Sequence, residues 1–415
     1  MASAGFVKDV TETAGQRTIL LLILIPEFWQ FEKKLKITIK TTSRCTAVQF
    51  TPAHWKNILI ASAAFLRSFW WMKMKNWREN LTLANTWTIA RGSTKELQVS
   101  LVELSHPDGT SGLGEAAPIS RYNETLDSVE SFYAKVDAAR LSFDDVPASM
   151  AYLETVASAN MAAKCAINIS LMDGAAKRAR KPVYDFLGLG FRENHHVTSF
   201  SIGIDTPEMI YKKVVAAAEY PVLKLKVGVP DDVAILRALR DAAPAKPVRV
   251  DANEGWTSRE LALERIQWLA QDGHIQFIEQ PMPSKTPVSD LVWLKKRSPL
   301  PIFADESYHQ VADVKHCAEC FHGVNVKLVK TAGISGGFAA LKAARAAGLK
   351  TMIGCMIETS VLISAAAHLA ELCDFLDVDG NILTTNDPYE GVTAKKGILS
   401  FAAAKGRVGL RVKKR

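Results

Sequence analysis

The stretch Val222-Leu-Lys-Leu-Lys-Val-Gly228 predicts a short β-strand that carries two lysines on one face. Side chains alternate between the two faces of a strand, so Lys224 and Lys226 project in the same direction. Two buried ammonium groups are costly to desolvate and repel each other, which means that they require nearby anions or a chemical role. The sequence therefore predicts acidic side chains beside this strand in the folded chain.

Charged residues end four later apolar runs of the sequence. Asp251, Glu279 and Asp305 each end one of these runs, and Lys327 ends another. Counted from Lys226, successive members of this series lie 22 to 28 residues apart. This spacing is typical of one strand followed by one helix and a return to the next parallel strand.

Residues 184–380 alternate apolar runs with amphipathic helical segments, which is the pattern of an α/β protein. Strands are predicted at residues 197–202, 222–227, 248–251, 275–279, 302–305, 324–328, 351–353 and 375–377. Eight such units favour a (β/α)7β barrel of the TIM type over an open sheet. Because the active site of such a barrel lies at the C-terminal ends of its strands, the acids and lysines are expected to converge there.

Residues 78–183 have a different pattern and predict an α+β capping domain. Strands are expected at residues 81–90 and 97–104, and helices at about 125–140 and 148–180. Residues 381–415 are expected to return to this domain and to end in a basic tail.

Residues 1–77 are interpreted as an N-terminal extension of unknown role outside the functional fold. They contain 11 Lys and Arg against 4 Asp and Glu, so much of the net charge of +8 lies there and in the tail. A membrane-surface anchor is the alternative, although the apolar runs at 18–25 and 57–66 are too short to span a bilayer. The body lacks a basic stripe interleaved with aromatics, which argues against nucleic acid as a partner.

The six cysteines show no disulfide-framework spacing and are typical of a reducing compartment, here the cytoplasm. The pair Cys317-x-x-Cys320 has two neighbouring histidines but no second ligand pair at zinc-site spacing. We interpret it as a structural part of a barrel helix. Homo-oligomer formation is left open by the sequence.

Three carboxylates at the ends of successive strands predict a metal centre. One acid at a strand end is often an N-cap or a solvated loop residue, but Asp251, Glu279 and Asp305 lie in register and are flanked by lysines. Convergent hard oxygen ligands suit one Mg²⁺ ion, for which Mn²⁺ can substitute.

Lys226 and Lys327 come from the strands before and after the three acids, so they are expected on opposite sides of a bound substrate. A divalent cation and a second lysine nearby would lower a lysine pKa from about 10.4 toward neutral pH, as a general base requires. A metal that binds a substrate carboxylate stabilises the enediolate formed when the adjacent carbon loses its proton. Together these groups predict inversion at a carbon next to a carboxylate.

Several short motifs occur in one order, each about one strand-helix unit from the next. They are Lys224-Leu-Lys226, Asp251-Ala-Asn253, Phe277-Ile-Glu-Gln-Pro281, Ala304-Asp-Glu306 and Val324-Asn-Val-Lys327. Over residues 81–408 this set closely resembles the muconate-lactonising subgroup of the enolase superfamily. The resemblance implies Mg²⁺ on the three acids, acid/base roles for Lys226 and Lys327, and polarisation of the substrate carboxylate by Lys224.

The last predicted strand indicates which enzymes within this subgroup the sequence resembles most. Asp377 and Asp379 lie two residues apart in Phe375-Leu-Asp-Val-Asp-Gly380, which a simple Asp-Gly turn would also explain. Together with Met356-Ile-Glu358-Thr-Ser360 the pair resembles the dipeptide epimerases, where such acids hold the free ammonium group of an L-aminoacyl residue. That resemblance implies epimerisation of the C-terminal residue of an L,X-dipeptide of the L-Ala-D/L-Glu type, with Met356 and Glu358 in the substrate-binding set.

Three alternatives share parts of this pattern. An N-acylamino-acid racemase or o-succinylbenzoate synthase, or a muconate-type cycloisomerase, would use the same metal and lysines but would have no ammonium group for Asp377 and Asp379. A non-catalytic metal-binding barrel is an alternative of another class. In the capping domain, Arg91, Arg121 and Tyr122 are candidates to contact the substrate, and an arginine there would favour an acidic C-terminal residue such as Glu.

Overall fold

The structure, a computed structural model, describes residues 38–40, 45–47 and 71–415. The chain divides into a unit of residues 1–66 and a unit of residues 67–415. In the first unit, the described residues form an antiparallel pair of strands, β1 (Thr38–Lys40) and β2 (Cys45–Ala47). Most of the predicted extension therefore lies outside the described residues, and its role stays a prediction. Among the described helices, none has the length and apolar character that a membrane span requires.

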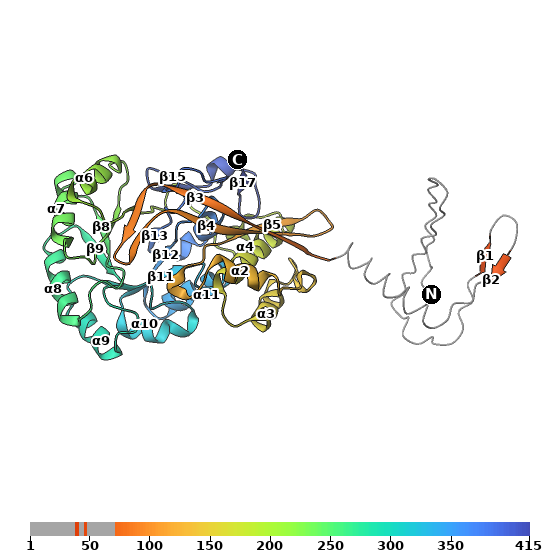
Figure 1. The fold of residues 1–415 in the computed structure, drawn as a ribbon, viewed down its shortest axis with the longest axis horizontal. Coiled ribbons are helices and arrows are strands. Elements are labelled where there is room, and N and C mark those ends of the chain that lie inside the picture. Colours follow the sequence, from red (N-terminus) through yellow and green to blue (C-terminus); the bar gives the residue numbers. More distant parts are fainter. Residues whose placement is uncertain (1–37, 41–44, 48–70) are drawn as a thin grey trace. The chain divides into compact units, whose positions relative to one another are not determined.

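The capping domain consists of a three-stranded antiparallel sheet and three helices. The sheet contains β3 (Lys73–Ile89), β4 (Gly92–Ser105) and β5 (Ser111–Ala116). The helices are α2 (Leu126–Tyr133), α3 (Val146–Val156) and α4 (Met161–Arg178), and short 3-10 turns occur at Ser120–Tyr122 and Ala138–Arg140. Figure 1 shows α2, α3 and α4 to the right of the barrel helices α6 to α9, whereas the long strands β3 and β4 extend across the barrel.

Several predicted bounds in this domain were wrong. The helix predicted at about 125–140 ends at Tyr133, and a separate 3-10 turn occurs at Ala138–Arg140. The first strand starts at Lys73 rather than at 81, because its polar and partly exposed N-terminal half pairs with β4 as far as Ser105. The predicted helix 148–180 is two helices, because the backbone is extended at Ala157 and left-handed at Asn160 (φ 64°). The backbone conformations at Ala157 and Asn160 leave the helical spacing of the apolar residues unchanged, and the single helix was predicted from that spacing.

Helix α4 packs unusually closely on β5. A Cβ atom at Gly112 or Gly114 would lie 1.9 Å from the carbonyl oxygen of Ser170 or Ala166, respectively, so no larger residue fits at either position. The Ala-rich composition of α4 therefore permits a backbone-to-strand contact that fixes the sheet of the capping domain.

The second domain is the predicted (β/α)7β barrel, which the structure confirms. Its parallel strands are β6 (Phe200–Ile202), β7 (Leu223–Lys226), β8 (Val248–Asp251), β9 (Ile275–Glu279), β10 (Ile302–Ala304), β11 (Gly323–Lys327), β12 (Lys350–Gly354) and β13 (Phe375–Asp377). They pair in sequence order, and a bridge between Thr198 and Leu376 brings the first strand beside the last. The barrel is therefore closed, and the C-terminal ends of its strands surround one mouth.

A helix follows each of the first seven barrel strands. These helices are α6 (Pro207–Ala216), α7 (Asp232–Ala242), α8 (Arg259–Ala270), α9 (Val288–Arg297), α10 (Val314–Cys320), α11 (Ile334–Ala346) and α12 (Ser360–Ala367), while α5 (Val183–Phe186) precedes the barrel. Cys317 and Cys320 are buried on α10, as the structural interpretation expected. A 3-10 turn at Val311–Asp313 directly precedes α10.

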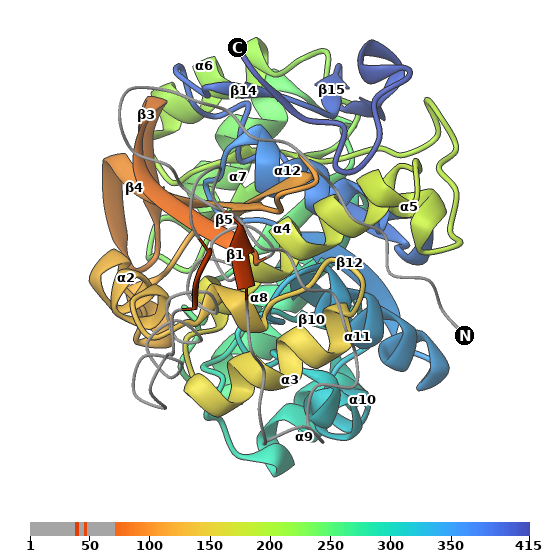
Figure 2. The same cartoon turned by 90° about the vertical axis from the view of Figure 1, so that its right-hand side faces the viewer.

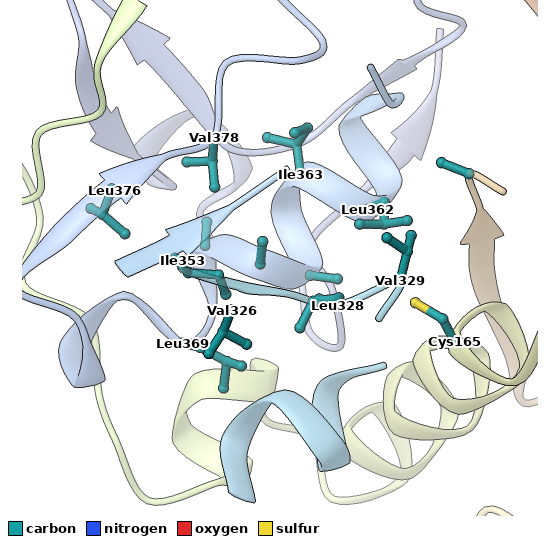
Figure 3. Close-up of a cluster of buried hydrophobic side chains, with 14 of the residues drawn as sticks. Cys165, Val326, Leu328, Val329, Ile353, Leu362, Ile363, Leu369, Leu376 and Val378 are labelled. Carbon is teal, nitrogen blue, oxygen red and sulfur yellow. The ribbon is translucent and has the colours of Figure 1, made fainter. Parts of the chain in front are cut away.

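One continuous apolar core joins the barrel to the capping domain. Figure 3 shows Val326 of β11, Ile353 of β12 and Leu376 of β13 in a cluster with Leu362 of α12. Cys165 of the capping helix α4 lies at the edge of the same cluster. Shared burial of this kind fixes the capping domain at a definite position relative to the ends of the barrel strands.

The C-terminal segment contacts both domains. It contains β14 (Tyr389–Glu390), β15 (Thr393–Lys395), β16 (Ile398–Ser400) and β17 (Lys413–Lys414), and β14 lies beside α12 (Figure 2). The N–H of Leu410 donates to Asp173 of the capping domain (2.8 Å), and the N–H of Val392 donates to Ser364 of α12 (2.9 Å). The chain end therefore ties the capping domain to the barrel.

His368, directly after α12, is buried at this junction. Its Nε2–H donates to the Leu410 carbonyl (3.1 Å), and its Nδ1 accepts from the Tyr184 N–H (3.2 Å). Both ring nitrogens of the neutral imidazole are thus satisfied. Burial lowers the pKa of His368 to about 3, although the bond to Leu410 acts in the opposite direction.

We expect this histidine to make the fold sensitive to acid. The unfolded chain binds a proton at His368 near its ordinary pKa of about 6.5, whereas the folded chain does not until about pH 3. Stability should therefore fall by about 1.4 kcal/mol per pH unit as the pH decreases from about 6.5. Urea unfolding of wild type and His368→Gln from pH 7 to pH 4.5 measures this slope.

The quantity compared between the proteins is the change in the free energy of unfolding per pH unit. A loss of stability that is the same at every pH therefore does not affect the result. His368→Gln should show a pH slope smaller by that amount, and the exposed His274→Gln should retain the wild-type slope. Identical slopes for all three proteins would contradict the assignment.

Candidate active site

The three predicted metal ligands converge at the mouth of the barrel. Asp251 ends β8, Glu279 ends β9 and Asp305 directly follows β10. All three side chains are buried, and one carboxylate oxygen from each lies within 4.8 Å of the others. The predicted convergence is confirmed.

The two outer lysines approach the acids from opposite ends of the triad. Lys226 of β7 lies 2.6 Å from Asp251, and Lys327 of β11 lies 2.8 Å from Asp305. Three strands, β8, β9 and β10, separate β7 from β11 in the barrel. A group held above the triad would therefore have one ammonium nitrogen on each side.

Lys224 occupies a different place, inside the ring of acids. Its Nζ lies 2.7 Å from Glu279, 2.7 Å from Asp377 and 3.1 Å from Asp251. Burial alone would lower the pKa of Lys224, but these three carboxylates raise it well above the usual range. Lys224 is accordingly a fixed positive charge at the centre of the site.

The pKa of Lys327 differs from the sequence expectation. From the sequence we expected a nearby divalent cation to lower the pKa of this lysine. Among the protein groups alone, burial lowers the pKa of Lys327, while the charge of Asp305 raises it well above its ordinary value. Lys327 and Lys330 in turn hold the pKa of Asp305 well below its usual range against the effect of burial.

The acids fit a hard divalent cation. A protein donor fixes one oxygen of each carboxylate, and the second oxygen faces the lysines. The donors are the backbone N–H of Asn253 for Asp251 (2.9 Å), the Asn325 amide for Glu279 (2.7 Å) and the Lys330 ammonium for Asp305 (2.7 Å). The inward oxygen of Glu279 is buried and accepts no hydrogen bond of good geometry. Oxygen ligands that are oriented in this way suit Mg²⁺.

Asp377 and Asp379 lie on the opposite wall, at the end of β13. Asp377 accepts from Ser199 (2.8 Å) as well as from Lys224, and Asp379 accepts from the backbone N–H of Ser201 (2.7 Å). Burial, together with the charge of Asp377, raises the pKa of Asp379 to about 7. The pair is a buried anionic surface beside the triad, and a cation from a ligand would stabilise its charge.

A cavity of about 610 Å³ lies above these groups, between the barrel mouth and the capping domain. Its barrel wall includes the three lysines and both aspartates of β13. The capping wall comes from the β3–β4 hairpin and from the segment around the 3-10 turn at Ser120–Tyr122, so both domains enclose the space above the triad.

All three candidate capping residues line this cavity, but both arginines already pair with acids of the barrel. Arg91 lies 2.9 Å from Glu306, and Arg121 binds Glu254 through two contacts of 2.8 Å. Tyr122 is half-buried, and desolvation raises the pKa of its hydroxyl, so it is neutral.

The two candidates after β12 lie at different depths. Met356 lines the cavity, with its sulfur 3.9 Å from Nζ of Lys327. Glu358 does not line it; the side chain is buried below the loop and accepts from the Met356 N–H (2.9 Å). Burial and the charge of Glu115 raise the pKa of Glu358 to about 8.

Sequence reasoning missed three polar residues of the site. Lys330 binds Asp305 from below, and Glu254 and Glu306 bind the capping arginines. Glu306 directly follows a ligand, and Lys330 lies three residues after Lys327, so both positions offered a signal. Glu254 follows Asn253 in a left-handed backbone conformation (φ 70°), which the sequence did not indicate.

Two family models match most of the second unit. Residues 72–188 match the mandelate racemase/muconate lactonizing enzyme N-terminal domain, and residues 210–394 match the enolase C-terminal domain-like model.

Curated relatives match over nearly the same span. An L-Ala-D/L-amino acid epimerase of Pedosphaera parvula is 65% identical over 345 residues, which are 82% of this chain and 99% of the relative. An L-Ala-D/L-Glu epimerase of Bacteroides thetaiotaomicron is 37% identical over 80% of this chain and 85% of the relative.

Solved structures have the same fold. A substrate-liganded complex of the L-Ala-D/L-Glu epimerase from Bacillus subtilis aligns with a TM-score of 0.78 and 26% identity, covering 83% of this chain and 99% of that one. A dipeptide epimerase from Enterococcus faecalis, complexed with Mg and L-Leu-L-Tyr, aligns with a TM-score of 0.76 and 28% identity. This alignment also covers 83% of this chain and 99% of that one. The chain therefore belongs to the mandelate racemase/muconate lactonizing enzyme family, with an enolase-like barrel domain.

Proposed function

We propose that this protein is a dipeptide epimerase, an isomerase that inverts the α-carbon of the C-terminal residue of an L,X-dipeptide, which is the reaction type of the L-Ala-D/L-Glu epimerases. One observation carries the proposal: Lys226 and Lys327 lie at opposite ends of one buried carboxylate triad, with an aspartate pair on the facing wall. Similarity to the epimerases of P. parvula and B. thetaiotaomicron supports the same reaction.

The two lysines perform the proton transfers in this proposal. One lysine in its neutral form removes the α-proton from one face, and the other in its ammonium form returns a proton to the opposite face, which inverts the centre. A Mg²⁺ ion on Asp251, Glu279 and Asp305 would stabilise the negative charge that develops on the substrate carboxylate. Lys224 adds a fixed positive charge beside that carboxylate.

Asp377 and Asp379 would hold the free α-ammonium group of the substrate. Both line the cavity, and both are buried, so an ion pair formed there is screened little by water. An N-acylamino acid has no such ammonium group and would leave both acids without a partner. This difference favours the dipeptide over the N-acylamino acid. The five cysteines within residues 71–415 are free thiols, which agrees with our proposed location in the cytoplasm.

Proton exchange in D₂O tests the reaction directly. With Mg²⁺ and L-Ala-L-X dipeptides, ¹H NMR should show loss of the α-proton signal of the C-terminal residue and growth of the signals of its epimer. Exchange with N-succinyl amino acids but with no dipeptide would replace the proposal by the racemase alternative.

Lys330 offers a test of how the triad is held. Methionine at this position leaves one oxygen of Asp305 without its donor, so we expect a 10- to 100-fold lower affinity for Mg²⁺ or activity. Rates measured against Mg²⁺ concentration distinguish the two effects. The exposed Lys342→Met on α11 is the matched control. An unchanged Mg²⁺ dependence in Lys330→Met would contradict this role.

A further inference from the structure

Two cations belong to the capping-domain wall of the cavity. Arg91 comes from the β3–β4 hairpin and Arg121 from the turn after β5, and the other capping residues that line the cavity are uncharged. The apolar members of this wall are Trp87, Ile89, Leu97, Ala117, Pro118 and Ile119. The uncharged polar members are Ser93, Thr94, Gln98, Ser120 and Tyr122. An ion pair between this wall and an acidic substrate side chain would therefore require one of the two arginines.

Arg121 is held by the barrel. Its Nε and Nη2 each donate to Glu254 at 2.8 Å, and Nη2 also donates to Ser284 (3.0 Å). Glu254 is only 9% exposed and accepts a further bond from the Ser284 N–H (2.7 Å). A bidentate pair with a buried, fixed carboxylate is strong and directional.

Arg91 is held in a similar way. Its Nη1 lies 2.9 Å from Glu306 and donates to the carbonyl of Asn253 (2.9 Å). The side chain of Glu306 is 1% exposed, and its second oxygen has no hydrogen-bond partner. Withdrawing Arg91 toward a substrate would leave a buried carboxylate without its cation, which is unfavourable.

The four groups Arg91, Arg121, Glu254 and Glu306 form an interdomain clasp with no net charge. A substrate carboxylate beside this clasp would add an uncompensated negative charge in a partly buried place. An apolar side chain would instead meet the apolar residues of the same wall. The ring of Trp87 lies 5.9 Å from Nζ of Lys226, so it adjoins the position of the carbon that this lysine would deprotonate.

From this geometry we infer that the cavity takes dipeptides whose C-terminal side chain is apolar, and that the arginines join the two domains and do not bind an acidic side chain. The inference rests on the proposed epimerase function. It replaces the sequence-based expectation of an acidic C-terminal residue.

Two dipeptides with C-terminal side chains of similar length test the inferred preference for an apolar side chain. We expect kcat/KM for L-Ala-L-Met to exceed that for L-Ala-L-Glu by at least about 10-fold, the discrimination that one polar or apolar contact commonly supplies. An equal or higher value for L-Ala-L-Glu would overturn the inference and leave the epimerase function intact. Failure to epimerise any dipeptide would instead refute the proposed function.

Two variants separate a clasp from an acid-binding site. Arg91→Met should lower kcat/KM for both dipeptides by a similar factor, whereas an acid-binding arginine would lose L-Ala-L-Glu selectively. Glu254→Gln removes the negative charge that neutralises Arg121, so the ratio of L-Ala-L-Glu to L-Ala-L-Met activity should rise several-fold. A selective loss of L-Ala-L-Glu activity in Arg91→Met, or an unchanged ratio in Glu254→Gln, would contradict the clasp.

Discussion

Replacing Lys226 with methionine is expected to lower epimerisation at least about 10³-fold, because one of the two proton-transfer groups is lost. The methionine keeps the apolar part of the side chain under Trp87 and removes only the ammonium group beside Asp251. Lys327→Met should have an effect of the same size from the other side. Full progress curves followed by polarimetry, with L- and D-configured C-terminal residues, measure both losses.

The two variants should differ in which epimer still exchanges its α-proton. Each variant keeps one lysine, which can remove and return a proton on its own face of the α-carbon. One variant should therefore exchange deuterium into the L-epimer without inversion, and the other into the D-epimer. Exchange of both epimers by either single variant would contradict a site with one lysine on each face. The exposed Lys212→Met on α6 should behave as wild type.

The part of this arrangement that the sequence predicted is the part encoded by local periodicity. Lys226, Asp251, Glu279 and Lys327 each end a strand, and a parallel barrel brings strand ends together whatever the details of its loops. Spacing of about one strand-helix unit was therefore enough to predict their convergence.

The partners of the capping arginines could not be obtained in this way. Arg121 meets Glu254 across 133 positions of the chain, through a loop whose left-handed backbone no periodic pattern indicates. Arg91 meets Glu306 only because the capping domain is positioned over the barrel mouth by packing between domains. The sequence thus showed two arginines near the substrate but not the acids that neutralise them.

The second prediction with a large effect concerns the carboxylate triad of Asp251, Glu279 and Asp305. Glu279→Gln keeps the size of the side chain and an oxygen that can accept from Asn325, but it removes the negative charge of the carboxylate whose inward oxygen faces Lys224. Because Mg²⁺ prefers charged oxygen ligands, we expect the variant to lose binding of Mg²⁺ and with it at least about 10³-fold in activity.

A measurement without turnover separates binding of the cation from chemistry. A ligand at 100 times its Kd stabilises a folded protein by about 2.7 kcal/mol, so Mg²⁺ at that level should raise the Tm of wild type by several degrees. Glu279→Gln should show no such shift, whereas Lys226→Met, which retains all three carboxylates, should keep it. If Glu279→Gln lost activity yet kept the full Mg²⁺-induced shift, Glu279 would act on the substrate and not on the cation. The exposed Glu260→Gln on α8 controls for the loss of one negative charge, since its carboxylate lies outside the triad and should leave both the shift and the rate unchanged.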